Sequence, residues 1–164
     1  EDLFEELGYK KLSEKYGVSL IDLNGAETQE VVHSGFLKFS EIEIPKIQKD
    51  SILISLPKLV EDEETELSGS LSTMLGAFPA RHYSGFFSRT KNKLRKWPIK
   101  YSIHDILRCK MPDFAVVDAS EKGSILAGIP FEMDKQSAKL MGKEWKMIPY
   151  LNLLHAELPK ENET

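Results

Sequence analysis

The stretch DSILISLP, residues 50–57, carries the strongest strand signal in the chain. Its apolar residues run almost continuously from Ile52 to Leu56, with little alternation between apolar and polar positions. Continuous apolar strands are typical of parallel sheets, in which both faces are covered. The stretch therefore predicts a strand that is buried on both sides and ends at Pro57 and Lys58.

Helical and strand-like segments alternate on either side of this strand. Apolar residues at helical spacing predict helices over 1–17, 67–78, 102–109, 133–142 and 146–158. β-prone runs predict strands over 18–23, 113–119 and 124–128 and a weaker one within 29–45, where Pro45 excludes a central strand. The alternation indicates an α/β fold with a mostly parallel or mixed sheet flanked by helices.

Two acidic side chains have local interpretations at predicted helix starts. Ser102 followed by Asp105 has the spacing of a capping box, in which the hydroxyl and the carboxylate satisfy free backbone N–H groups. Asp134 precedes the segment 135–141 and is interpreted as its N-cap.

Length and composition predict one globular domain over residues 1–164. The chain is 41% hydrophobic and 29% charged, and no apolar run approaches the ~20 residues of a membrane helix. We therefore expect no contact with a membrane. Cys109 is the single cysteine, which excludes an internal disulfide and a zinc or iron–sulfur site built from cysteines of this chain alone. A reducing cytoplasm fits this composition, so a cytoplasmic location is predicted.

Charge is distributed unevenly along the chain. Residues 61–66 are acidic at all but one position, yet the consecutive acids lack the spaced oxygens of a calcium loop, which favours a solvated loop or the N-terminal turn of a helix. The segment 89–97 combines Arg and Lys residues with Trp97, and 81–100 as a whole is predicted to be exposed. A solvated or partner-facing segment is favoured there. Nucleic-acid binding through 89–97 is the weaker alternative, because the rest of the chain is acidic.

Polar residues follow two predicted strands. Ligands of α/β sheets bind outside the carboxyl ends of the strands, where Lys58 and Asp118 lie. Lys58 is interpreted either as an anion anchor or as a surface residue. Asp118 is either a ligand-binding carboxylate or a turn-forming residue that accepts from its own backbone. Arg81 and His82 form either an anion clamp or a solvated loop pair.

Five short motifs occur in an order that resembles a known family. They are ISLPKL, GSLSTMLGAFP, RH at 81–82, DFAVVDA and ILAGIPFEMDKQSAKLMG. The series is similar to DUF362, an archaeal and bacterial domain that is often fused to ferredoxin-like iron–sulfur modules. The resemblance covers about residues 18–154 and implies a divergent member, truncated at its start. It also implies that Lys58, His82, Asp118 and Asp134 are site residues.

The departures from the family pattern concern charge. The resemblance implies Pro-Lys-x-Lys-x-His after the buried strand, but the second Lys and the His are replaced by Val60 and Asp62. A Lys-Asn pair is replaced by Ser72 and Thr73. A cationic cleft would thereby become acidic, and like charges would repel an anion.

The resulting hypothesis is a degenerate site in a non-catalytic module that binds a small molecule or a protein. It includes no cofactor and no metal of its own. The alternative is a redox-linked or cofactor-dependent enzyme that uses Lys58, His82 and Asp118 with a separate iron–sulfur partner chain.

Overall fold

The computed structural model describes residues 3–79, 84–85, 88–92 and 98–157, and side chains within 3–79 and 98–157. Its central element is a three-stranded sheet in the order β3-β6-β7, formed by β3 (Ile54–Ser55), β6 (Phe114–Ala119) and β7 (Ser124–Gly128). β3 pairs with β6 in parallel, and β6 pairs with β7 antiparallel. The predicted α/β fold with a mixed sheet is confirmed.

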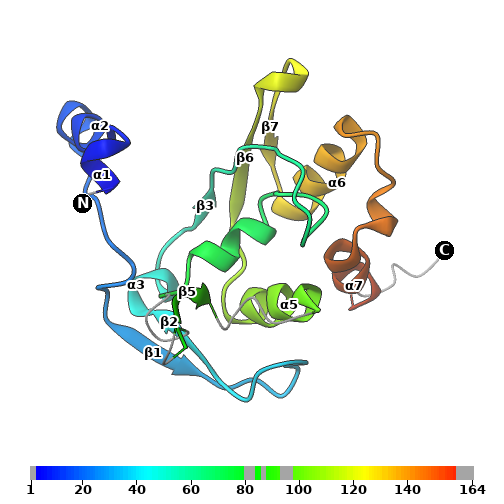
Figure 1. The fold of residues 1–164 in the computed structure, drawn as a ribbon, viewed down its shortest axis with the longest axis horizontal. Coiled ribbons are helices and arrows are strands. Elements are labelled where there is room, and N and C mark those ends of the chain that lie inside the picture. The colour runs from blue at the N-terminus through cyan, green and yellow to red at the C-terminus, as the bar shows by residue number, and fades with distance from the viewer. Residues whose placement is uncertain (1–2, 80–83, 86–87, 93–97, 158–164) are drawn as a thin grey trace.

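Helices cover one face of this sheet (Figure 1). α6 (Pro130–Leu140) packs on β6 and β7, and α7 (Pro149–Glu157) continues the helical layer after η3 (Trp145–Met147). α5 (Ile99–Cys109) packs between α7 and η1 (Ser72–Gly76). One continuous core unites these elements, and its fully buried members include Leu71, Ile106, Val117 and Leu151.

No described element covers the opposite face of the sheet, which changes the environment of the strand at 50–57. Ser55 and Pro57 are buried, whereas Ile52, Ile54 and Leu56 are exposed. The prediction of burial on both sides is therefore wrong. Side chains of a strand alternate between its two faces, and only the face toward the helices has a partner layer here.

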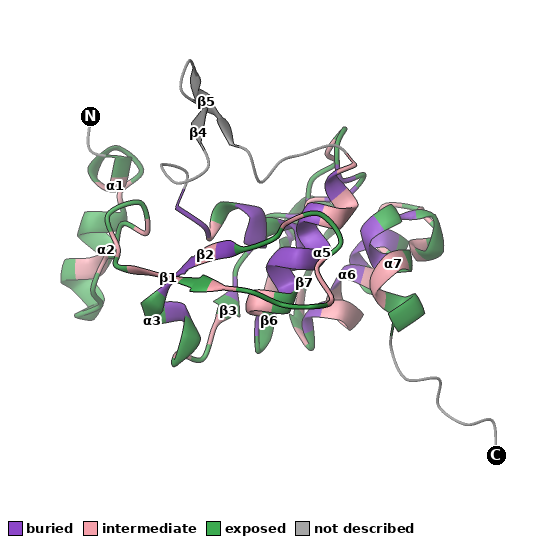
Figure 2. Ribbon diagram, turned by 90° about the horizontal axis from the view of Figure 1, so that it is seen from below, coloured by how far each residue is buried: buried purple, intermediate pink, exposed green. Residues whose placement is uncertain are grey.

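The N-terminal part adds two short helices and a separate ladder. α1 (Leu3–Glu6) and α2 (Tyr9–Tyr16) contain no buried residue and stand apart from the core in Figure 2. β1 (Thr28–Val31) and β2 (Ile42–Pro45) form an antiparallel pair that α3 (Lys46–Lys49) follows. Pro45 thus ends a two-stranded ladder, in agreement with its exclusion from a central strand.

One predicted strand is absent from the described residues, and the basic segment contributes to a strand that the sequence did not predict. Segment 18–23 is not a strand, because it pairs with no described strand and Val18 and Ile21 are exposed. The basic segment contributes residues to β5 (Ser88–Asn92), which pairs antiparallel with β4 (Ser84–Gly85). Residues 93–97 of that segment lie outside the described part, as do Arg81 and His82.

Helix starts differ from the predicted ones for identifiable reasons. Only η1 is helical within 67–78, because side chains bind the backbone N–H groups of Gly69, Ser70 and Leu71 before it. α5 begins at Ile99 after Pro98, so the predicted capping box lies inside a helix. α6 begins with Pro130 at its first position, which suits the fixed φ of proline.

None of the described helices is long and apolar enough to span a lipid bilayer.

Candidate functional site

The carboxyl ends of β3 and β6 bring Lys58 and Asp118 together, as their positions in the sequence predict. The two residues form a parallel β-bridge just beyond the strand β3. The Leu59 N–H donates to the Asp118 carbonyl at 2.8 Å, and the Asp118 N–H donates to the Pro57 carbonyl at 2.9 Å. Both side chains are exposed and lie on the uncovered side of the sheet, to which Ile54 and Leu56 also point.

The Lys58 ammonium group forms an ion pair with a carboxylate in the turn after β6. Its Nζ lies 2.7 Å from Oε1 of Glu121, which belongs to η2 (Ser120–Lys122) between β6 and β7. The hydrogen bond to Glu121 raises the pKa of Lys58, and the charges of Glu121 and Asp118 act in the same direction. The ammonium group at this strand end is therefore one half of an ion pair.

Asp118 makes the turn-type contact that the sequence left as one of two alternatives. Its Oδ1 accepts from the Ser120 N–H at 2.9 Å. Hydrogen bonds from Ser120 lower the pKa of the Asp118 carboxyl, and the Lys58 charge contributes further. The carboxylate is ionised and faces Lys58 from the neighbouring strand.

The acidic run forms a loop that closes next to this pair. Val60 bridges to Ser68, and the residues between them return the chain toward the core. Asp62 Oδ1 organises the loop, because it accepts from the N–H groups of Glu64 and Thr65 and from the Thr65 hydroxyl.

Lys143 neutralises part of the acidic loop from outside. Its Nζ lies 2.8 Å from Glu61 and 3.2 Å from Glu66. The hydrogen bond to Lys143 lowers the pKa of the Glu61 carboxyl. Glu66 also has a left-handed backbone with φ 66°, so its position is held at a conformational cost. The sequence suggested a solvated loop. The structure shows instead that Lys143 pairs with two of its carboxylates.

A polar pocket of about 210 Å³ lies between the acidic loop and η1. Asp62, Ser72 and Thr73 line it, and these are the three positions at which the resemblance implies His, Lys and Asn. Thr65, Ser68, Leu75 and Gly76 complete the lining. The described lining residues include no Lys, Arg or His. Residues that depart from the family pattern in two separate motifs therefore line the same pocket, which presents hydroxyl groups and one carboxylate.

Asp134 has a different position from the one its N-cap interpretation predicts. It lies inside α6 and is fully buried. Its carboxylate accepts from the Ser70 N–H at 2.6 Å, the Ser70 hydroxyl at 2.7 Å, the Leu71 N–H at 3.1 Å and the Tyr150 hydroxyl at 3.0 Å. Burial raises the pKa of Asp134, and these four hydrogen bonds oppose the rise. The residue joins α6 and α7 to the turn before η1.

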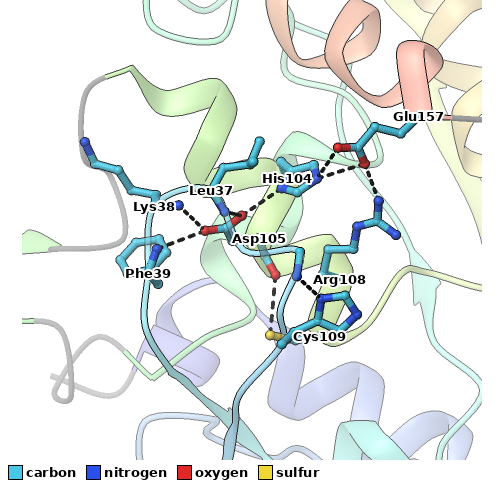
Figure 3. A network of polar contacts seen from close by, with 10 residues as sticks. Leu37, Lys38, Phe39, His104, Asp105, Arg108, Cys109 and Glu157 are labelled. Carbon is cyan, nitrogen blue, oxygen red and sulfur yellow. Dashed lines mark hydrogen bonds and ion pairs between the residues drawn. The ribbon is translucent and has the colours of Figure 1, made fainter.

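A second buried polar cluster was not predicted as a unit (Figure 3). His104 is fully buried, and its Nδ1 lies 2.7 Å from Asp105 Oδ1 while its Nε2 lies 2.9 Å from Glu157 Oε2. Arg108 also bonds to Glu157. The two ring nitrogens of His104 thus connect Asp105 of the same helix with Glu157 at the end of α7.

The Asp105 carboxylate binds backbone groups of a distant loop and not the N-terminus of its own helix. The carboxylate accepts from the N–H groups of Leu37, Lys38 and Phe39 at 2.7–3.0 Å. The capping-box interpretation of Ser102 and Asp105 is therefore wrong, because the carboxylate holds a distant loop. Adjacent His and Asp residues on an amphipathic helix were the available signal, but their partners lie more than 50 residues away.

The described residues contain no group of three or more His, Cys, Asp or Glu side chains that could hold a metal ion. Arg81 and His82 lie outside the described residues, so their proposed part in the site stays a prediction.

Comparison with known proteins gives one family. The sequence model described as "Domain of unknown function (DUF362)" matches residues 1–132. Comparisons with curated proteins and with solved structures gave no match. The family match includes α1 and α2, which the resemblance over 18–154 left out, and it contains Lys58, Asp118 and the polar pocket but not Asp134. Because the match spans most of the chain, the protein belongs to the DUF362 family.

Proposed function

We propose that this protein is a binding module of the DUF362 family whose strand-end site no longer holds anionic ligands and has no catalytic activity. The observation that carries this proposal is the pairing of Lys58 with Glu121 at 2.7 Å beside the ionised Asp118. The pocket beyond the strand end supports it, since Asp62 and hydroxyl groups line that pocket. The single cysteine is in keeping with a cytoplasmic location, which we include in the proposal.

Anion binding at the strand end depends on competition for one ammonium group. A phosphate or carboxylate approaching Lys58 would have to displace Glu121 and would meet the charge of Asp118. An exposed ion pair contributes only about 0–1 kcal/mol, so the pairing weakens anion binding without making it impossible. Two acids beside a single lysine nevertheless make the net local charge negative, which disfavours an anion further.

Neutral polyhydroxyl molecules and small organic cations fit the pocket better. The negative charge of Asp62 attracts a cation, and the hydroxyls of Ser68 and Thr73, which line the pocket, can both donate and accept. With about 210 Å³ the pocket accommodates a small ligand or part of a larger one.

The adjacency of Lys58 and Asp118 supports one alternative function. A redox-linked enzyme served by a separate iron–sulfur partner would use these residues together with His82. Purification without oxygen, followed by an absorption spectrum and metal analysis, tests it. A bound chromophore that Asp118→Ala removes would favour this enzyme over the binding module.

The test of the binding module is a gain of function. Inorganic phosphate is titrated into the protein and into the double variant Glu121→Gln/Asp118→Asn, with binding followed by calorimetry. We expect negligible binding to the natural protein and at least tenfold tighter binding to the double variant, because a tenfold change requires only ~1.4 kcal/mol.

A second double variant controls for total charge. Glu41→Gln/Asp50→Asn makes the same change in net charge at exposed positions outside the strand-end site and the acidic loop. It should leave phosphate binding unchanged. Tight phosphate binding by the natural protein, abolished by Lys58→Ala, would refute the proposal.

A further inference from the structure

The uncovered face of the sheet is apolar. We define the outer sheet face by Ile54, Leu56, Phe114, Ile125 and Ile129. Leu56, Ile125 and Ile129 are 72%, 70% and 67% exposed, respectively. Ile54 lies opposite Phe114 across the parallel pair, so the two side chains are neighbours on this face. The charged groups of Lys58, Asp118 and Glu121 border it at one end.

Such a face is unusual for the type of pairing present. Sheets of parallel strands almost always have both faces covered, and the pair β3-β6 of this mixed sheet is parallel. Contiguous exposed apolar patches rimmed by polar residues mark interaction sites. The outer sheet face has the apolar centre and charged border of a protein interface.

The chain carries a second apolar surface that none of the described elements covers. We define the arm as residues 3–17, which contain α1 and α2. Tyr9, Leu12 and Tyr16 follow one side of α2 at helical spacing, and Leu12 and Tyr16 are 49% and 65% exposed. The two helices pack on each other and bury none of their residues. The arm is set apart from the central sheet, at the end of the connection that leads to β1 (Figure 1).

We propose that a second copy of this chain covers the outer sheet face. The arm of each copy packs on the outer sheet face of the other, which gives a twofold symmetric dimer by reciprocal exchange. A helix on a sheet is a stable two-layer arrangement, and this pairing satisfies both unpartnered surfaces at once. The two reciprocal contacts together form one interface that is the same on both copies, so the exchange closes with two copies.

The area agrees with a stable dimer. One arm-to-sheet contact removes on the order of 500 Å² of apolar surface, if each partly exposed side chain contributes the area implied by its transfer free energy. Two reciprocal contacts remove on the order of 1,000 Å². With the usual polar share, this reaches the ~1,200–2,000 Å² of specific protein interfaces.

Light scattering after size exclusion tests the proposal on the full chain. We expect the mass of a dimer for the natural protein. Leu56→Asp on the outer sheet face and Leu12→Asp on the arm should each halve the mass. Both side chains are exposed in the single copy, so the circular dichroism spectrum should not change. Met147→Asp, 77% exposed but on neither surface, is the control and should remain dimeric.

Mixing the two monomeric variants tests the exchange itself. The Leu56→Asp copy retains a normal arm, and the Leu12→Asp copy retains a normal outer sheet face. One of the two contacts is thereby restored, so the mixture should form a heterodimer that dissociates more readily than the natural dimer. A monomeric natural protein, or a dimer that survives both substitutions, would overturn the proposal.

Discussion

Asp134 shows how one buried carboxylate can fix several segments. Its oxygens receive four hydrogen bonds, from Ser70, Leu71 and Tyr150, and thereby hold α6, α7 and the turn before η1 in one arrangement. The cost of burying a carboxylate is offset only when such donors are present. The polar pocket depends on this arrangement, since η1 supplies one of its walls.

Gly69 leaves the space that this carboxylate occupies. A Cβ at position 69 would lie 2.5–2.7 Å from the carboxyl atoms of Asp134, which the surrounding hydrogen bonds prevent from moving. We expect Gly69→Ala to reduce the free energy of unfolding by about 3 kcal/mol, through overpacking and the loss of hydrogen bonds. Urea denaturation followed by circular dichroism measures the change.

Gly76 provides the matched control on the same segment. A Cβ there would meet no atom within 4 Å, so Gly76→Ala should be neutral or stabilising by up to about 1 kcal/mol. Equal destabilisation by both substitutions would show that Asp134 is not held in place as described.

Single residues were predicted well where their partners are local and poorly where they are distant. For Asp118 the turn contact was one of the two alternatives that the sequence left open, because its partner Ser120 lies two residues away. Asp105 and Asp134 were both assigned to helix caps, although their carboxylates bind backbone groups more than 60 residues away. Cap spacing alone cannot reveal such contacts, because only tertiary packing determines them.

At the scale of elements, the cluster around His104 clamps α5 to the end of α7. Glu157 is the last residue of α7, and its carboxylate receives His104 and Arg108 from α5. Partial burial acts to raise the pKa of the Glu157 carboxyl, but these hydrogen bonds outweigh it, so the pKa lies below its ordinary value of 4.5. The clamp therefore stabilises the folded state when Glu157 is ionised.

We expect Glu157→Gln to reduce the free energy of unfolding by about 1–2 kcal/mol at neutral pH, because the charge of the carboxylate that accepts from Arg108 is lost. A carboxyl whose pKa is lowered by folding contributes stability above its ordinary pKa, and that contribution disappears as the pH falls through the folded-state pKa. The natural protein and the variant should thus converge in stability below pH 4.5. Denaturation at a series of pH values measures this.

Glu144→Gln serves as the control for the clamp, since Glu144 is exposed and outside the cluster. Its effect should be small at every pH. A difference for Glu157→Gln that persists unchanged into acid would contradict the assigned role of the carboxylate.

Strands and helices were predicted best where the spacing of apolar residues reflects packing against a single neighbouring layer. The antiparallel pair β6 and β7 and the helix α7 agree closely with the predicted strands at 113–119 and 124–128 and helix at 146–158. The segment 67–78 was predicted to be fully helical, but hydrogen bonds from Ser72 and Asp134 claim its first backbone N–H groups. Apolar spacing cannot detect this competition, because it ignores side-chain donors and acceptors.

At the scale of the whole molecule, the sequence predicts the fold class but not which face of the sheet is open. A run such as ILISL is compatible with burial on both faces of a sheet. Only the arrangement of the described helices shows that one face of the sheet has no covering layer. The described core is continuous from β2 to α7. The single domain predicted over residues 1–164 should therefore unfold as one unit.

Cys109 offers a probe of that cooperativity. Burial raises the pKa of its thiol to about 12, and the charge of Asp105 adds to the effect. The native thiolate is consequently scarce at pH 8. Part of the loss is recovered through higher nucleophilicity, so we expect reaction with a disulfide reagent to be roughly 30–100-fold slower than in the unfolded chain.

If the chain is one cooperative domain, thiol reactivity and circular dichroism should give the same midpoint in urea, because both then report a single transition. Protein concentration must be fixed, since the stability of a dimer rises with concentration, and that dependence should vanish in Leu56→Asp. Exposure of Cys109 at a lower urea concentration than the loss of helix would contradict the prediction. It would show that α5 separates from β2 and η1 while the layer around α6 stays folded.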